Sequence, residues 1–365
     1  MTLQWYFARR FAVSFLSMLS IFAGLIWMTD MVETLRSLAS DEFGIQEAAG
    51  LALLQLPGTI YEVIPLIMVL ATITLFLKMA RTSELIVTRA AGRSAIRSLI
   101  APVLVAALIG GIGISAINPI VAATSRIADE TRDTVRGRVT SVLSLSRNGL
   151  WLRQAAPDGQ IVIHAAGVSP GGTALYDVTF LRFDRDALPK QRIAAARAEL
   201  VPGAWDMTGV KTWDLSGRTN PEASAVEQAW MRLPSDLTLN QIRDSFGEPS
   251  AIPIWQLPAF ITQLEAAGFA ALSHRVWLHS ELASPVFLIS MVLIGAAFTM
   301  RHTRFGRTGL MVLFAVLLGF SMYFLKSFAL VLGETGKIPV LIAAWFPPLA
   351  GICLALALLL HQEDG

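Results

Sequence analysis

Six apolar runs, each long enough to cross a membrane, constrain this chain more than any other feature of its sequence. They occupy residues 11–29, 58–77, 98–120, 282–300, 309–332 and 340–360. A helix rises 1.5 Å per residue, so about twenty residues cross the roughly 30 Å hydrocarbon core of a bilayer. The composition agrees, because 54% of the residues are hydrophobic and only 15% are charged. We therefore predict a polytopic α-helical membrane protein with six transmembrane helices.

The short loops predict how these helices are oriented, because Lys and Arg are retained on the cytoplasmic side. One end of the predicted bundle collects Arg9, Arg10, Lys78, Arg81, Arg89, Arg93, Arg97, Arg301, Arg304 and Arg307, whereas the other end has only Arg36 and Lys337. Both termini are therefore expected in the cytoplasm, and the segment between the third and fourth runs on the opposite side. The first run is longer than the 7–15 apolar residues of a cleaved signal peptide, so we expect it to stay as a helix.

The segment between the third and fourth runs has the composition of a soluble domain. Residues 121–147 are polar and are expected to extend the third helix. Short runs with partial alternation of apolar and polar residues follow, separated by turn sequences such as Pro157-Asp158-Gly159 and Ser216-Gly217. This pattern is typical of antiparallel strands, and it fits a sandwich, a barrel or a jelly roll equally well. Residues 235–280 return to helical spacing and connect back to the membrane.

Three parts follow from this pattern. Residues 1–120 hold the first three transmembrane helices, residues 121–272 form a β-rich domain with helical connectors, and residues 273–365 hold the last three transmembrane helices. The one cysteine, Cys353, lies in the last apolar run, so the β-rich domain has no disulfide.

Signatures of catalysis and of nucleotide binding are missing from the sequence. The segment Gly333–Lys337 imitates the end of a phosphate-binding loop but lacks the upstream glycine, and no H-E-x-x-H or G-x-S-x-G pattern occurs. His274, His279 and Glu281 could bind a metal ion, although a polar cluster near the membrane interface explains them better. We expect no enzymatic activity, no cofactor and no nucleic-acid partner.

Charged residues in or near the apolar runs gather toward the outer half of the bundle. They are Asp30, Glu33, Arg36, Glu62 and Lys326. Such charges are costly in hydrocarbon and usually face protein or water. Two interpretations are open: local pairing with snorkelling to the interface, or a polar rim around a cavity that opens outward.

The segment Arg81–Arg93, RTSELIVTRAAGR, joins the second and third runs and carries one carboxylate among its arginines. As a helix it places Arg81, Glu84 and Thr88 on one face, with Gly92 available to end it. We predict a short amphipathic helix at the membrane surface. In the simplest interpretation it is an interfacial helix with a local Arg81–Glu84 pair.

The order of these motifs resembles a known family. The segment 81–92 after the second run, the β-rich insert, Glu281–Pro285 opening the fourth run, and Gly333–Pro339 followed by Ala344–Pro347 opening the sixth are similar to the LptF/LptG permeases. These are the membrane subunits of the lipopolysaccharide export ABC transporter. The resemblance covers essentially the whole chain and is closer to the LptG branch than to the LptF branch.

The resemblance implies a non-catalytic permease in the inner membrane of a Gram-negative bacterium. Its partners would be an LptF-like permease, an LptB-like ATPase dimer that binds the ATP, and an LptC-like anchored periplasmic protein. It would extract lipopolysaccharide from the outer leaflet and pass it to a periplasmic bridge, with the β-domain a periplasmic jelly roll. An alternative is a mechanotransmission or scaffold subunit that carries no lipid.

Site residues follow from the same resemblance. Segment 81–93 would be the coupling helix that the ATPase engages, through Glu84 and with Arg81, Thr88, Arg89 and Arg93 around it. Lipopolysaccharide would meet the outer charges Arg36, Lys326, Asp30, Glu33 and Glu62. The chain departs from the family here, because Arg36 is the only cation after the first run and Glu281 replaces a usual lysine.

Overall fold

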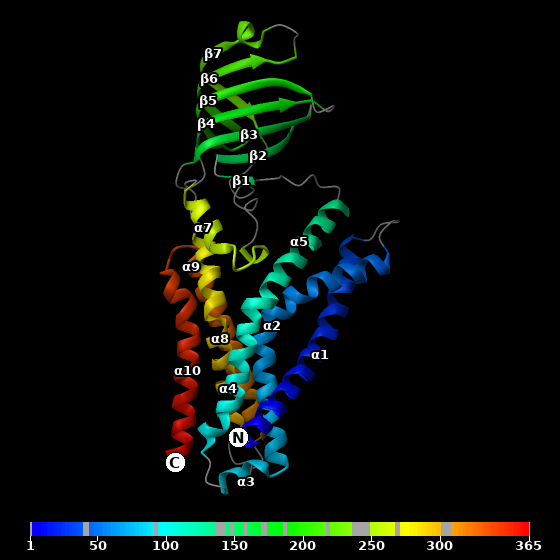
Figure 1. Cartoon of the computed structure of the whole chain (residues 1–365), viewed down its shortest axis with the longest axis vertical. Helices are drawn as coiled ribbons and strands as arrows, with labels where there is room; N and C mark the ends of the chain where they lie inside the picture. The colour runs from blue at the N-terminus through cyan, green and yellow to red at the C-terminus, as the bar shows by residue number, and fades with distance from the viewer. Residues whose placement is uncertain are drawn as a thin grey trace. The chain divides into compact units, whose positions relative to one another are not determined.

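The structure is a computed structural model that describes residues 2–38, 44–90, 94–135, 144–146, 149–156, 159–168, 174–184, 188–216, 220–235, 249–266, 271–300 and 308–364 (Figure 1). It divides into two compact units, which are described separately. The first unit comprises Met1–Arg132 and Leu272–Gly365, and the second comprises Asp133–Ala271.

The first unit is a bundle of long helices. Its elements are α1 (Thr2–Leu38), α2 (Ile45–Arg81), α3 (Glu84–Ala90), α4 (Ala95–Ile112), the π-helix η1 (Gly113–Ile117), α5 (Asn118–Val135), α8 (Leu272–Thr299), α9 (Thr308–Glu334) and α10 (Val340–Asp364). Within the described residues, six helical stretches are long and apolar enough to span a membrane, and each contains one predicted run to within one residue at either end of that run. The six-helix prediction is therefore confirmed. Arg93 and residues 301–307, which entered the prediction of orientation, lie outside the described residues.

The bundle is built around α2 and α8. In the most apolar stretches of these two helices 61% and 67% of the residues are buried, compared with 11% in α1 and α9, which lie on the outside. Small residues allow the inner helices to pack closely, as is common in membranes. A Cβ atom added at Gly110 of α4 would lie 2.6 Å from the backbone of Pro285 in α8.

The third span is continuous from Ala95 to Val135 but contains one irregular turn. The π-helix η1 separates α4 from α5, and such single turns often occur at functional sites. Gly113 in this turn faces the ring of Tyr61 from α2. Helix α5 continues the third span as far as Val135, and the division between the two compact units falls between Arg132 and Asp133, within the last turn of α5.

The second unit is built on one antiparallel sheet. Its strands are β1 (Ser144–Ser146), β2 (Gly149–Ala156), β3 (Gly159–Val168), β4 (Ala174–Phe183), β5 (Pro189–Val201), β6 (Ala204–Asp214) and β7 (Val226–Pro234), paired in sequence order. The short helices are η2 (Pro221–Ser224), η3 (Pro249–Ala251) and α7 (Leu257–Ala266). The inserted β-domain is confirmed. Its described strands form a meander, which settles the strand order that the sequence pattern left open.

One face of this sheet supplies the core of the second unit. The alternation in β3 buries Ile161, Ile163 and Ala165, and Ile163 lies opposite Phe180 of β4. The ring of Phe180 meets Trp205 of β6 edge-on, with 5.9 Å between the ring centroids, and both side chains are fully buried. The period of two read from the sequence is therefore the period of burial in the sheet.

Candidate functional site

The first candidate site lies at the turn between α2 and α3. Helix α2 ends at Arg81, and Ser83 has a positive φ of 56°, a conformation that ends a helix. Helix α3 begins only at Glu84. The expected helix from Arg81 is therefore corrected: Arg81 belongs to α2, and the turn removes the helical spacing that would have paired it with Glu84.

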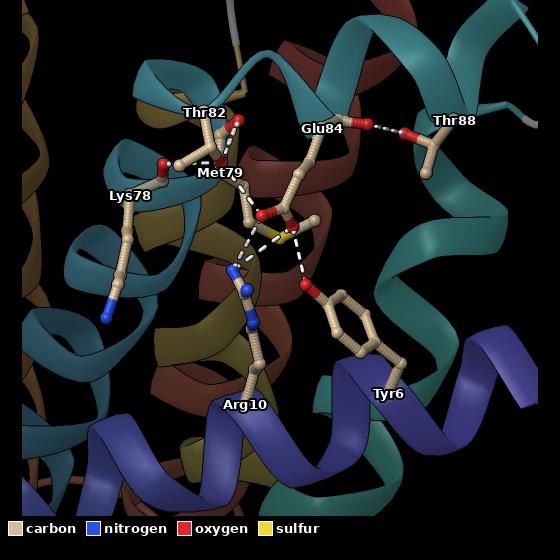
Figure 2. Close-up of polar contacts among 7 residues, drawn as sticks. All are labelled: Tyr6, Arg10, Lys78, Met79, Thr82, Glu84 and Thr88. Carbon is tan, nitrogen blue, oxygen red and sulfur yellow. Dashed lines mark hydrogen bonds and ion pairs between the residues drawn. The ribbon is translucent and has the colours of Figure 1, made fainter.

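Glu84 instead meets the start of α1 (Figure 2). Its Oε2 accepts a hydrogen bond of 2.9 Å from the Tyr6 hydroxyl, and its Oε1 lies 2.9 Å from Nη1 of Arg10. The Thr82 hydroxyl donates to Oε1, also at 2.9 Å. The Arg10 guanidinium also lies over the Tyr6 ring, 4.6 Å from its centroid. We call these four residues, Tyr6, Arg10, Thr82 and Glu84, the Glu84 clamp.

The clamp favours the charged form of Glu84. Partial burial alone would raise the pKa of the Glu84 carboxyl, but hydrogen bonds from Tyr6 and Thr82 and the charge of Arg10 outweigh it and lower the pKa below its ordinary value. The side chains of Arg10 and Glu84 are 33% and 26% exposed, so water screens the ion pair. An ion pair of this kind contributes about 1 kcal/mol or less.

The rest of α3 separates an inward and an outward face. Leu85 is buried in the helical core, whereas Val87 is 67% exposed. The hydroxyl of Thr88 donates to the main-chain oxygen of Glu84 and so serves the helix itself. The structure places Arg89 in α3 without describing its side chain, and Arg93 lies outside the described residues.

A second polar site lies within the bundle. A cavity of about 190 Å³ is lined by residues of α2, α4, η1, α8 and α9. Its charged lining residues are Glu62, Glu281 and Lys326, and its aromatic lining residues are Tyr61, Trp277 and Tyr323. Two of the predicted outer charges, Glu62 and Lys326, are therefore brought together at one cavity.

Glu281 is the centre of this polar network. Its side chain is buried, it accepts a hydrogen bond from the Tyr61 hydroxyl, and Asn118 is a further hydrogen-bond partner. Lys326 interacts electrostatically with Glu281, and its Nζ lies 5.0 Å from the ring centroid of Phe287. The sequence pointed to Glu281 as a member of a polar cluster near the membrane interface and as a departure from the family, but it gave no sign of Tyr61 or Asn118 as its partners. The π-helix beside Asn118 has no simple signature in the sequence.

The other predicted outer charges lie elsewhere. Asp30 interacts with Thr59 and with the charge of Arg132, whereas Glu33 and Arg36 are exposed and do not line the cavity. In the part of the chain that the structure describes, no three His, Cys, Asp or Glu side chains are grouped in a way that could hold a metal ion.

The sequence was compared with known protein families, and one family matches it. The sequence profile of the lipopolysaccharide export system permease family LptF/LptG matches residues 5–361, which is nearly the whole chain. The chain belongs to the LptF/LptG family. Members of this family are non-catalytic subunits that export lipopolysaccharide, and the six long apolar helices make this LptF/LptG chain a membrane protein. The profile does not separate LptF from LptG, and no curated protein sequence matches the chain.

Proposed function

We propose that this LptF/LptG chain is the LptG-type half of an ATP-driven lipopolysaccharide exporter in a Gram-negative inner membrane. It pairs with an LptF-like permease, and an LptB-like ATPase dimer binds and hydrolyses the ATP. An LptC-like anchored protein completes the complex. Both termini and α3 lie in the cytoplasm, and the sheet lies in the periplasm. The family match and the concentration of Lys and Arg at one end of the bundle support this assignment.

The docking site of the ATPase in this proposal rests on one observation, the exposed face of α3. A helix between two spans, anchored by Leu85 and by the Glu84 clamp, exposes an apolar side chain, Val87, away from the bundle. An amphipathic helix held in this way suits a groove on a partner protein. The ATPase dimer is therefore assigned to this face of α3.

A photocrosslinker placed at Val87 tests the assignment. It should capture the ATPase in the assembled complex. A matched crosslinker at Val226, which is 53% exposed on β7, should not capture it because the sheet is assigned to the other side of the membrane. Capture at Val226 alone would reverse the proposed orientation, and capture at neither position would refute docking on α3.

We assign the first contact with lipopolysaccharide to Arg36. It is exposed at the end of α1, whereas the ammonium of Lys326 already interacts with Glu281. Arg36→Glu replaces attraction to a lipid phosphate by repulsion, which should weaken lipid binding by about 2–5 kcal/mol if the site is partly desolvated. The control is Arg9→Glu, at the opposite end of α1.

Crosslinking from position 36 separates transport from pure mechanotransmission. Lipid adducts that depend on Arg36 support transport through this chain. Protein adducts alone, with export unaffected by Arg36→Glu, would favour a subunit that transmits force and carries no lipid.

A further inference from the structure

The cavity in the bundle lies at the depth of lipid head groups. Glu281 directly precedes the apolar run 282–300, and Glu62 is the fifth residue of the run 58–77. Trp277, one helical turn before Glu281 in α8, also lines the cavity, and tryptophan is enriched where hydrocarbon meets head groups. Glu62 is exposed as well as lining the cavity, so the cavity opens to the surface of the bundle beside Glu62.

Two hydrogen-bond donors at this cavity are left unused by the chain itself. The indole Nε1 of Trp277 is buried and, among the residues that the structure describes, finds no hydrogen-bond partner. A buried donor without a partner is costly. Lys326 interacts electrostatically with Glu281 and lies over the Phe287 ring, but in the described part of the chain its Nζ makes no direct ion pair or hydrogen bond. Both donors suit the oxygen atoms of a phosphate.

The cavity also has more acidic than basic groups. Glu62 and Glu281 supply two carboxyl groups, whereas Lys326 supplies one ammonium. The rings of Trp277 and Tyr323 add aromatic surface. Carboxylates and aromatic faces both attract an ammonium group, and the carboxylates repel a ligand that carries several phosphates. A ligand with one phosphate and one ammonium therefore fits this lining best.

We propose that the cavity binds the head group of phosphatidylethanolamine, in which one phosphate is joined to one primary ammonium. The phosphate meets Trp277 Nε1 and the Lys326 ammonium, and the ammonium of the lipid meets the Glu62 carboxylate at the opening. A cavity of about 190 Å³ suits a small head group, whereas the acyl chains stay in the hydrocarbon. The site lies within one permease chain, so it requires neither the ATPase nor the second permease of the proposed function.

Native mass spectrometry of the full-length permease in detergent measures this binding. Phosphatidylethanolamine is compared with phosphatidylglycerol of identical acyl chains, because both carry the phosphate and only the first carries an ammonium. We expect phosphatidylethanolamine to bind about tenfold more tightly, the size of one hydrogen bond to a charged group. Equal binding of the two lipids, or binding of neither, would overturn the proposal.

Two variants test the two ends of the head group. Trp277→Phe keeps an aromatic ring but removes the N–H, and it should weaken phosphatidylethanolamine binding by about tenfold. Glu62→Gln, at an exposed position that tolerates the change, should abolish the preference over phosphatidylglycerol. The controls Trp255→Phe and Glu47→Gln, at exposed positions that do not line the cavity, should change neither quantity. Unchanged binding in Trp277→Phe, or an unchanged preference in Glu62→Gln, would overturn the proposal.

Soluble O-phosphoethanolamine decides whether the membrane is the source of the head group. It has the same phosphate and ammonium but no acyl chains, so it should compete with the phospholipid only weakly. Competition at equal concentration would overturn the assignment to a phospholipid. Phosphatidylethanolamine should also raise the unfolding temperature of the wild-type permease, because a ligand that binds the folded state stabilises it. Failure of the permease to bind an ATPase, with the lipid preference intact, would refute only the proposed function.

Discussion

Glu281 and Lys326 should depend on each other inside the bundle. Glu281 is only 4% exposed, and the Tyr61 hydroxyl, Asn118 and the charge of Lys326 together compensate for its burial. Removing one member of a buried charge pair leaves the other without compensation and typically costs about 3–5 kcal/mol. Removing both charges is often close to neutral, because the cost of burying them disappears as well.

The magnitudes follow from which contacts each variant loses. Glu281→Ala removes the acceptor of the Tyr61 hydroxyl as well as the charge, so we expect the upper end of that range. Glu281→Gln keeps an acceptor and removes only the charge, and it should cost about 1–3 kcal/mol. Lys326→Met should cost a similar amount because Glu281 then loses its cation. The double variant Glu281→Gln/Lys326→Met should lie within about 1 kcal/mol of the wild type.

Unfolding of the purified protein in detergent measures the four species of this double-mutant cycle. The two single effects add up to about 2–6 kcal/mol, so a double variant close to the wild type implies an interaction free energy of at least about 1 kcal/mol, as residues that share a network show. Lys337→Met is the control, because Lys337 is exposed and its loss should change stability by less than about 0.5 kcal/mol. Effects of Glu281→Gln and Lys326→Met that simply add would refute the reasoning.

Three further predictions concern packing and pH. Trp205→Ala should destabilise the sheet unit by about 3–5 kcal/mol because the side chain is fully buried, whereas Trp230→Ala, at a 55% exposed position, should cost less than about 0.5 kcal/mol; limited proteolysis compares them. Gly110→Ala should cost about 1–3 kcal/mol in thermal unfolding because its Cβ would meet α8 at 2.6 Å, whereas Gly111→Ala meets nothing within 4 Å and should be tolerated. The pKa of Glu84 is lowered in the folded chain, so the contribution of Glu84 to stability is present above the unfolded pKa and is lost as the pH falls through the folded pKa. The difference in unfolding free energy between the wild type and Glu84→Gln should therefore shrink below about pH 4.5. A difference that stays constant with pH would show that the clamp is absent.

Much of the fold could be predicted because its signals are local. An apolar run of sufficient length specifies a span without any knowledge of its neighbours. The alternation of apolar residues in β3 specified the buried face of that strand, and β2 ends at Ala156 and β3 begins at Gly159, as the turn sequence between them predicted. Strand order was not available from these signals, because antiparallel sandwiches, barrels and meanders share the same period.

The partner of Glu84 could not be found in the same way. Tyr6 and Arg10 are 78 and 74 residues away in sequence, and their contact depends on how α1 packs beside α3. The end of α2 was also hidden, because a serine rather than a glycine adopts the positive φ at position 83. A local pair with Arg81 therefore looked sufficient from the sequence.

The depth of a charged residue along its helix is a signal in the sequence that could have predicted the interaction between Glu281 and Lys326. Glu281 lies nine residues into α8, and Lys326 lies eight residues before the end of α9. Successive spans run in opposite directions, and at 1.5 Å per residue these two positions fall at nearly the same level. A carboxylate and an ammonium at one level of a membrane bundle have a strong reason to interact, since hydrocarbon compensates neither. Sequence alone could therefore have proposed this pair.

The same reasoning, with helical rotation added, selects Arg10 over Arg9 as the partner of Glu84. Both arginines lie at the end of the bundle that holds α3, so depth does not distinguish them. Phe7 and Phe11 are spaced four residues apart and mark the buried stripe of α1. Arg10 follows Phe7 by three residues and borders that stripe, whereas Arg9 follows it by two and points roughly to the opposite side. Only Arg10 can thus turn its charge toward the rest of the bundle, and the exposed Arg9 is left to face outward.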